Sequence, residues 1–81
     1  MRIINIDTKQ EFDQIAAIRF YQDGCNVKGV IEVQGNQIPP DGMYSLPDHN
    51  DVSIHVKNDP SSIHEWLEFD VVVPTTKPIL P

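Results

Sequence analysis

The sequence holds few of the residues on which common functional sites are built. It has one cysteine, Cys25, which excludes an intramolecular disulfide and a site made of several thiolates. Its four glycines stand singly, which excludes a glycine-rich phosphate-binding loop. Only six lysines and arginines are present, and they are not clustered, so the chain is poorly suited to direct contact with nucleic acid.

Long apolar runs are absent as well. No stretch approaches the roughly 20 apolar residues of a membrane-spanning helix. The apolar part of the N-terminal segment MRIINIDTK is too short for a signal peptide. Together with the single cysteine, these features predict a cytoplasmic protein that does not associate with a membrane.

What is present is the composition of a small globular protein, with 81 residues of which 40% are hydrophobic and 22% charged. A chain this short buries only about 60% of its unfolded surface, so we expect one domain with a small core. We place that domain at residues 1–74. The remaining residues, 75–81 (TTKPILP), are proline-rich and lack a pattern, which predicts an extended tail.

The densest structural signals lie in residues 51–74. Apolar and polar residues alternate in 51–57, which predicts a strand with one buried face. Asp59-Pro60 is typical of an N-cap followed by the first residue of a helix, and the apolar spacing in 63–67 predicts a short helix. We expect Trp66 to be buried between that helix and the sheet, and a β-branched strand to follow.

The N-terminal part begins with a short β-branched segment at residues 2–6, a predicted strand. The T-x-x-E pattern from Thr8 to Glu11 is a capping box, which opens a helix. Apolar residues then recur at helical spacing, at Phe12, Ile15 and Ala16. The pattern predicts a helix that ends before Ile18 or, in the alternative interpretation, continues to Tyr21.

Turn signals organise the middle of the chain. Asp23-Gly24 lies between two alternating segments and predicts a hairpin of residues 18–22 with 26–34. Gly35-Asn36 suits a type II′ turn and predicts a further hairpin that folds residues 37–38 back. The turn-rich segment 39–50 (PPDGMYSLPDHN) predicts a long loop. We expect three hydrophobic side chains to pack this loop against the rest of the domain: Met43, Tyr44 and Leu46.

These elements predict an α+β fold in the order β-α-β-β-(β)-β-α-β. Its sheet is small and mainly antiparallel, and two short helices pack on one face. The element order resembles the split βαβ arrangement, with extra strand material in the middle. The alternative is a small open β-roll or barrel closed by the same helices.

No motif in the sequence predicts catalysis or a metal site. His49, His55 and His64 are separated by six and nine residues, which matches no usual ligand pattern. The segment 48–51 (DHND) lacks the glycine and the distant glutamate of an EF-hand loop. No nucleophile signature surrounds Cys25 or any serine. We therefore expect a protein that is not an enzyme and that uses no cofactor or metal.

Acidic side chains are concentrated in residues 41–70, which hold seven acids against Lys57 alone, whereas residues 1–40 are nearly balanced. Such a region suits a partner with a basic surface, although it also matches an acidic surface that only keeps the protein soluble. The residues predicted to bind a partner are Asp41, Tyr44, Asp48, Asp51, Glu65 and Glu68.

The sequence thus predicts a small acidic protein-binding module. In its sharpest form it is an inhibitor or immunity-type protein, of the kind a phage or mobile element encodes, that blocks a basic surface of another protein. The alternative is a structural component, for instance of a phage particle, that oligomerises through residues 39–50 and the tail. On either hypothesis the chain is a monomer or a small homo-oligomer.

Overall fold

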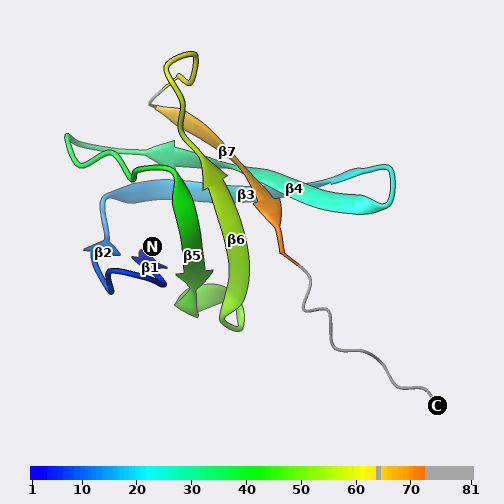
Figure 1. Cartoon of the computed structure of the whole chain (residues 1–81), viewed down its shortest axis with the longest axis horizontal. Helices are drawn as coiled ribbons and strands as arrows, with labels where there is room; N and C mark the ends of the chain where they lie inside the picture. The colour runs from blue at the N-terminus through cyan, green and yellow to red at the C-terminus, as the bar shows by residue number, and fades with distance from the viewer. Residues whose placement is uncertain (64, 73–81) are drawn as a thin grey trace.

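Seven strands form one antiparallel sheet in the computed structural model, which describes residues 1–63 and 65–72 (Figure 1). The strands are β1 (Ile3–Asn5), β2 (Glu11–Phe12), β3 (Ile15–Asp23), β4 (Asn26–Val33), β5 (Gly42–Leu46), β6 (Val52–Lys57) and β7 (Trp66–Val71). Their order in the sheet is β2-β1-β5-β6-β7-β4-β3. Within the described residues the only helical element is a 3-10 turn, η1 (Pro47–His49). The predicted α+β fold is therefore wrong, because neither predicted helix forms.

The first predicted helix is replaced by a turn between β1 and β2. The side-chain oxygen of Asn5 accepts the amide N–H groups of Asp7 and Thr8, each at 2.9 Å. The hydroxyl of Thr8 accepts the N–H of Gln10 at 3.2 Å, as in a local polar turn, and Lys9 has a left-handed φ of 67°. These bonds satisfy the backbone locally, so the apparent capping box opens no helix.

The predicted helical stripe of Phe12, Ile15 and Ala16 does not form, because Phe12 and Ile15 are buried as strand residues and Ala16 is exposed. The chain turns a corner at residues 13–14 between β2 and β3, and the register of β3 against β4 shifts between Ile15 and Ala17. A bulge of this kind adds one residue to a strand, so buried side chains fall three apart rather than two. Phe12, Ile15 and Ile18 are the buried residues of this region, each on a strand.

The second predicted helix is replaced by a loop and by β7. The N–H of Ser62 donates to the carbonyl of Asp59 at 2.9 Å, but this single turn is not continued as a helix. From Leu67 the buried side chains alternate, and β7 pairs with β4 on one side and β6 on the other. Trp66 lies on the outward face of β7 with 45% of its surface exposed, so its predicted burial is wrong.

The order of the strands requires the sheet to curl on itself. A flat sheet of seven strands would place its two edge strands about 29 Å apart, at about 4.8 Å per strand. The edge strands β2 and β3 are joined by residues 13–14 alone, which span at most about 11 Å. The backbone N–H of Gln34, after β4, donates to the carbonyl of Gln14 at this corner at 2.8 Å. The predicted alternative, a small open β-roll or barrel closed by helices, is wrong as well, because no α-helix forms in the described residues.

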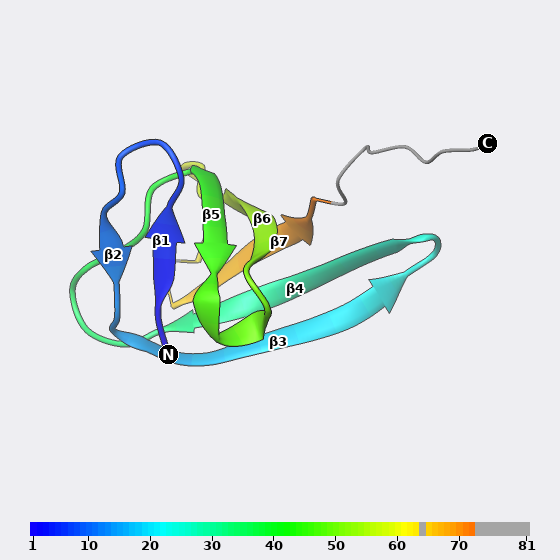
Figure 2. The same cartoon turned by 90° about the horizontal axis from the view of Figure 1, so that it is seen from below.

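Curling the sheet lays one half over the other, and the core fills the space between them. Figure 1 shows β5 and β6 crossing over β3 and β4, and Figure 2 shows the same layers from the side. Six buried residues come from each half. The first half supplies Ile3, Phe12, Tyr44, Leu46, Ile54 and Val56, and the second half supplies Ile15, Ile18, Ile31, Val33, Leu67 and Phe69.

Several local predictions are confirmed and others are not. The alternating segment 51–57 forms β6, and the predicted hairpin around Asp23-Gly24 forms from β3 and β4. Gly35-Asn36 does not start another hairpin, because residues 37–40 form no strand. The predicted loop 39–50 instead contains β5 and η1. The predicted end of the domain at residue 74 and the tail 75–81 lie outside the described residues.

Candidate functional site

The fold divides the predicted acidic surface into two separate groups. Asp48 and Asp51 lie in the connection between β5 and β6, around η1. Asp41 lies at the opposite end of β5, which separates it from Asp48 by five strand residues, about 17 Å. Glu68 stands opposite Lys57 at the far end of β6, so it belongs with Asp41 and not with the η1 connection. The acidic residues predicted to bind a partner therefore do not form one continuous surface.

Two of the predicted binding residues have structural contacts. The hydroxyl of Tyr44 donates to the carbonyl of Pro40 at 2.8 Å, and its ring is fully buried, so it cannot meet a partner in this structure. Burial raises the pKa of Tyr44 above its ordinary value of 10.0. Asp41 lies 3.6 Å from the Nε2 atom of His55 and accepts the N–H of Asn58 at 3.2 Å.

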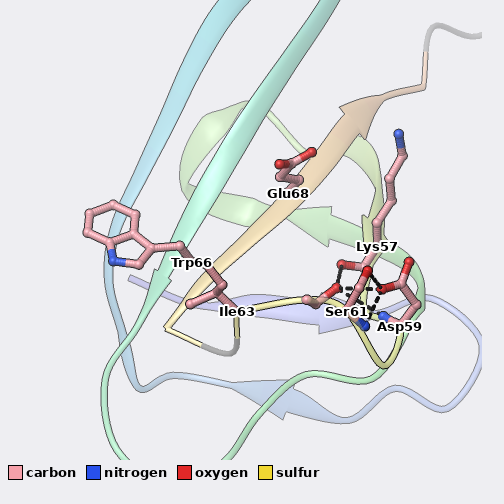
Figure 3. Close-up of a pocket in the computed structure, with 7 residues that line it drawn as sticks. Lys57, Asp59, Ser61, Ile63, Trp66 and Glu68 are labelled. Atoms are coloured by element: carbon pink, nitrogen blue, oxygen red, sulfur yellow. Dashed lines mark hydrogen bonds between the residues drawn. The ribbon is translucent and has the colours of Figure 1, made fainter.

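The strongest candidate surface surrounds Trp66, a residue that the sequence placed in the core. Trp66 and Ile63 are 45% and 64% exposed, and the N–H of Trp66 donates to the carbonyl of Ile63 at 2.9 Å. They line a shallow pocket of about 220 Å³. Figure 3 shows Ile63 and Trp66 at one side of the pocket and Lys57, Asp59 and Ser61 at the other, with Glu68 on β7.

Hydrogen bonds fix the polar side of this pocket. The Asp59 carboxylate accepts the N–H of Ser61 at 2.9 Å and its hydroxyl at 2.6 Å. It also accepts a longer bond from the Ser62 hydroxyl at 3.3 Å. These donors, led by the Ser61 hydroxyl, lower the pKa of Asp59 below its ordinary value of 3.8. The loop is therefore held as a polar turn that carries a negative charge at neutral pH.

Three further carboxylates belong to residues that neighbour Trp66 in the sheet or along the chain. Glu32 stands opposite Trp66 in the ladder of β4 and β7, Glu65 precedes it, and Glu68 follows two residues along on the same face. Among the described residues, no cationic group lies within 4.0 Å of any of these three carboxylates. We call Glu32, Ile63, Glu65, Trp66 and Glu68 together the Trp66 surface.

Two nearby cations, Lys57 and Lys28, are engaged with other carboxylates. The Nζ atom of Lys57 lies 2.9 Å from Asp70, and that of Lys28 lies 3.9 Å from Asp70 and 3.3 Å from Asp23. The hydrogen bond from Lys57, followed by the charges of Lys57, Lys28 and His55, lowers the pKa of Asp70 below 3.8. The hydrogen bond and charge of Asp23 raise the pKa of Lys28. This network leaves the Trp66 surface with an excess of negative charge.

The residues that could support a metal or nucleophile are spread over the molecule. His49 lies in η1 with its ring centroid 5.4 Å from that of Phe20, and His55 lies on β6. His64 lies outside the described residues. Within the described part of the chain, no three His, Cys, Asp or Glu side chains are grouped around a position that could hold a metal ion. Cys25 is exposed in the turn between β3 and β4.

Comparison with known proteins adds no relative. No family model, curated protein or solved structure matches this chain. In the described residues, no helix has the length and apolar character needed to cross a membrane.

The sequence identified Glu65 and Glu68 of the Trp66 surface but missed Ile63, Trp66 and Glu32. The first two were assigned to the apolar stripe of a helix, and Glu32 lay unremarked in the predicted strand of residues 26–34. The signal that could have placed Trp66 outside the core is the alternation of residues 66–71. Side chains alternate between the two faces of a strand. Because Leu67 and Phe69 point inward, Trp66 and Glu68 point outward.

Proposed function

We propose that the protein is a non-enzymatic binding module whose Trp66 surface takes a basic side chain of a partner protein. The observation that carries the proposal is an indole, 45% exposed, whose neighbours in the sheet and the chain include three glutamates with no cation within 4.0 Å among the described residues. A guanidinium or ammonium group stacks on an aromatic face and pairs with carboxylates, and an arginine does both at once. Tryptophan is also among the residues that contribute most to protein interfaces.

The proposal narrows the acidic surface predicted from the sequence. Glu65 and Glu68 remain as partner-binding residues, while Asp48 and Asp51 become part of the general acidic surface. Asp41, tied to His55 and Asn58, stands beside the site without belonging to it. In the inhibitor form of the proposal, a basic residue that the partner needs for its own activity is held against Trp66. We place this action in the cytoplasm, in keeping with a single cysteine that forms no intramolecular disulfide.

Trp66 is the single tryptophan of the chain, so its fluorescence reports directly on the proposed site. The test is titration with an arginine-rich peptide, and with a serine-glycine peptide of equal length as the control probe. We expect the arginine-rich peptide to change the Trp66 emission, and we expect the apparent affinity to fall steeply as salt is raised. Exposed charges are screened within about 8 Å at physiological ionic strength.

Two double variants separate a specific site from general attraction. Glu65→Lys with Glu68→Lys, and Asp48→Lys with Asp51→Lys, each raise the net charge of −6 by four, to −2. The first pair is expected to remove the response, whereas the second is expected to retain most of it. Equal loss in both double variants, or no response in the wild-type chain, would refute the proposed site.

A further inference from the structure

The distal half of β3 lies at an edge of the sheet, with the ring centroid of Phe20 5.4 Å from those of Phe69 and His49. β3 is the last strand in the sheet order, so among the described strands only β4 flanks it. Every residue from 19 to 26 is exposed, and Figure 2 shows the two strands extending past the other strands. The exposed edge of a strand is a template for pairing with another strand.

The hydrogen bonds of β4 establish which backbone groups occupy that edge. Successive residues of an antiparallel strand direct their N–H and C=O groups alternately to the two sides. The N–H of Val33, at the end of β4, donates to the carbonyl of Glu65, just before β7, at 3.0 Å. The odd-numbered residues of β4 therefore bond toward β7, and its even-numbered residues bond toward β3.

The residues of β3 then alternate in the same way. Arg19 and Tyr21 are the partners of even-numbered β4 residues, so their backbone groups point to β4. In agreement, the carbonyl oxygen of Arg19 lies against Gly29, where a side chain would collide with it. The N–H and C=O groups of Phe20 and Gln22 consequently point away from β4, toward the open edge.

A second copy of the same strand is complementary to this edge. A two-fold axis at Tyr21 places Phe20 opposite Gln22 of the second copy, so open backbone groups meet open backbone groups. On the outward face, Arg19 then lies opposite Asp23 of the second copy, twice by symmetry, and the two Tyr21 rings are paired. An axis at Arg19 would instead place the two Arg19 guanidinium groups opposite each other. An axis at Phe20 would place Arg19 opposite Tyr21, so Arg19 and Asp23 would not pair.

We infer that two copies of this chain pair through the exposed edges of β3, antiparallel and centred on Tyr21. The pairing joins the two sheets into one and matches the charges of Arg19 and Asp23 across the axis. Asp23 keeps its contact with Lys28 at 3.3 Å on its own hairpin, and its side chain is 59% exposed, which leaves room for the second cation. The surface involved lies on the opposite side of β4 from β7, so it does not include Trp66 or Glu68, although Arg19 lies diagonal to Glu32 across β3 and β4.

Exchanging the charges of Arg19 and Asp23 tests whether the partner is a second copy of the chain. The molar mass of the wild-type chain, measured by light scattering over a range of concentrations, is expected to rise toward that of a dimer. Arg19→Asp and Asp23→Arg each convert two symmetric attractions into repulsions, so each variant alone is expected to raise the dimer dissociation constant about tenfold. Mixing the two variants restores both attractions in a heterodimer, and the double variant restores them in a homodimer.

Cysteine linkage tests the register. In a Cys25→Ser background, Tyr21→Cys places two thiols directly opposite each other, where Cβ atoms are close enough for a disulfide, and oxidation is expected to give a covalent dimer. Arg19→Cys in the same background puts the thiols four residues apart along the strands, about 13 Å, beyond the reach of a disulfide.

Three results would overturn the inference. One is a wild-type chain that remains monomeric at every concentration. Another is a mixture of Arg19→Asp and Asp23→Arg that associates no better than either variant alone. The last is linkage through Arg19→Cys in preference to Tyr21→Cys. Circular dichroism of each variant verifies that the sheet is retained, and the Glu65→Lys, Glu68→Lys chain, which changes only the Trp66 surface, is expected to dimerise like the wild type.

Discussion

The position of a single residue on a strand decides whether its apolar surface is buried or offered to a partner. Trp66 and Phe69 lie three residues apart on β7, yet Phe69 is 1% exposed and Trp66 is 45% exposed. Phe69 points into the core, where its ring centroid lies 5.4 Å from that of Phe20. Trp66 instead adds apolar area to an outward face that otherwise carries acids. The same residue type that normally supports a core is thus a candidate for binding.

The two rings are expected to contribute very differently to stability. Phe69→Ala removes a fully buried ring and should lower the free energy of unfolding by about 3–5 kcal/mol. Trp66→Ala removes a ring that keeps much of its contact with water, so its loss should cost about 1 kcal/mol or less. Urea unfolding followed by circular dichroism measures both, because the second variant lacks the fluorescent reporter. A loss from Trp66→Ala as large as that from Phe69→Ala would mean that the indole is a core residue after all.

Asp70 is expected to make stability depend on pH. Its pKa is lowered in the folded chain, chiefly by the hydrogen bond from Lys57, so the unfolded chain takes up the proton first as the pH falls. The stabilisation is therefore present above the ordinary pKa of 3.8 and is lost as the pH falls through the lower, folded value. At 37% exposure the side chain is partly screened, so the effect at neutral pH is about 1 kcal/mol at most.

Thermal melting of Asp70→Asn against the wild type, at several pH values, measures this contribution. The variant is expected to melt lower at pH 7 and to match the wild type at the acidic end of the series. Asp48→Asn removes the same charge where no cation lies within 4.0 Å among the described residues, and it serves as the control. A difference between Asp70→Asn and wild type that is constant over the whole pH series would argue against the ion pair as its cause.

At the scale of the elements, the sequence predicts several strands correctly but also predicts two helices that do not form. The alternation in 51–57 and the turn at Asp23-Gly24 are local signals that lead directly to β6 and to the hairpin of β3 and β4. The spacing of Phe12 and Ile15 imitates a helix, because the corner at residues 13–14 that creates it is held by a distant segment, through the bond from the N–H of Gln34 to the carbonyl of Gln14. A local pattern cannot distinguish these causes.

For β5 the prediction from sequence errs in the opposite direction, because it misses a strand that forms. Its residues lie among prolines, glycine and aspartate, so the local signals favour a loop in 39–50. The strand forms nevertheless, because β1 and β6 supply backbone partners on both sides and Tyr44 and Leu46 are fully buried. Tertiary pairing here overrides weak local preference, as is common for strands.

For the whole molecule, closure of the sheet is the property that the sequence does not reveal. It brings β2 and β3 from opposite ends of the strand order to one corner, and it lays two sets of six core residues against each other. Closure also separates Asp48 and Asp51 from Glu65 and Glu68, which the sequence had grouped as one acidic region. Only the pairing of β4 with β7 brings Glu32 opposite Trp66 and completes the proposed site.

Closure buries the central strands but leaves the edge strand β3 with one unpaired side. Hydrogen exchange should therefore differ between the amides of the central strands and those of β3. In dilute solution the amides of Ile31 and Leu67, in adjacent central strands, are expected to exchange only through global unfolding. The amides of Arg19 and Tyr21 bond to β4 and are expected to be protected in part. Those of Phe20 and Gln22 point to the open edge and are expected to exchange fastest among the residues of β3.

Raising the concentration of the chain should then change this alternating pattern in one place. If the edges of β3 pair, the amides of Phe20 and Gln22 become hydrogen-bonded across the two-fold axis and exchange more slowly. The Arg19→Asp variant, expected to pair poorly, should show no such slowing at the same concentration. Protection of Phe20 and Gln22 that is already high in dilute wild-type protein would show instead that the edge of β3 is covered within one chain. In that case the exposed hairpin would be part of the fold's own closure and not a surface for a second copy.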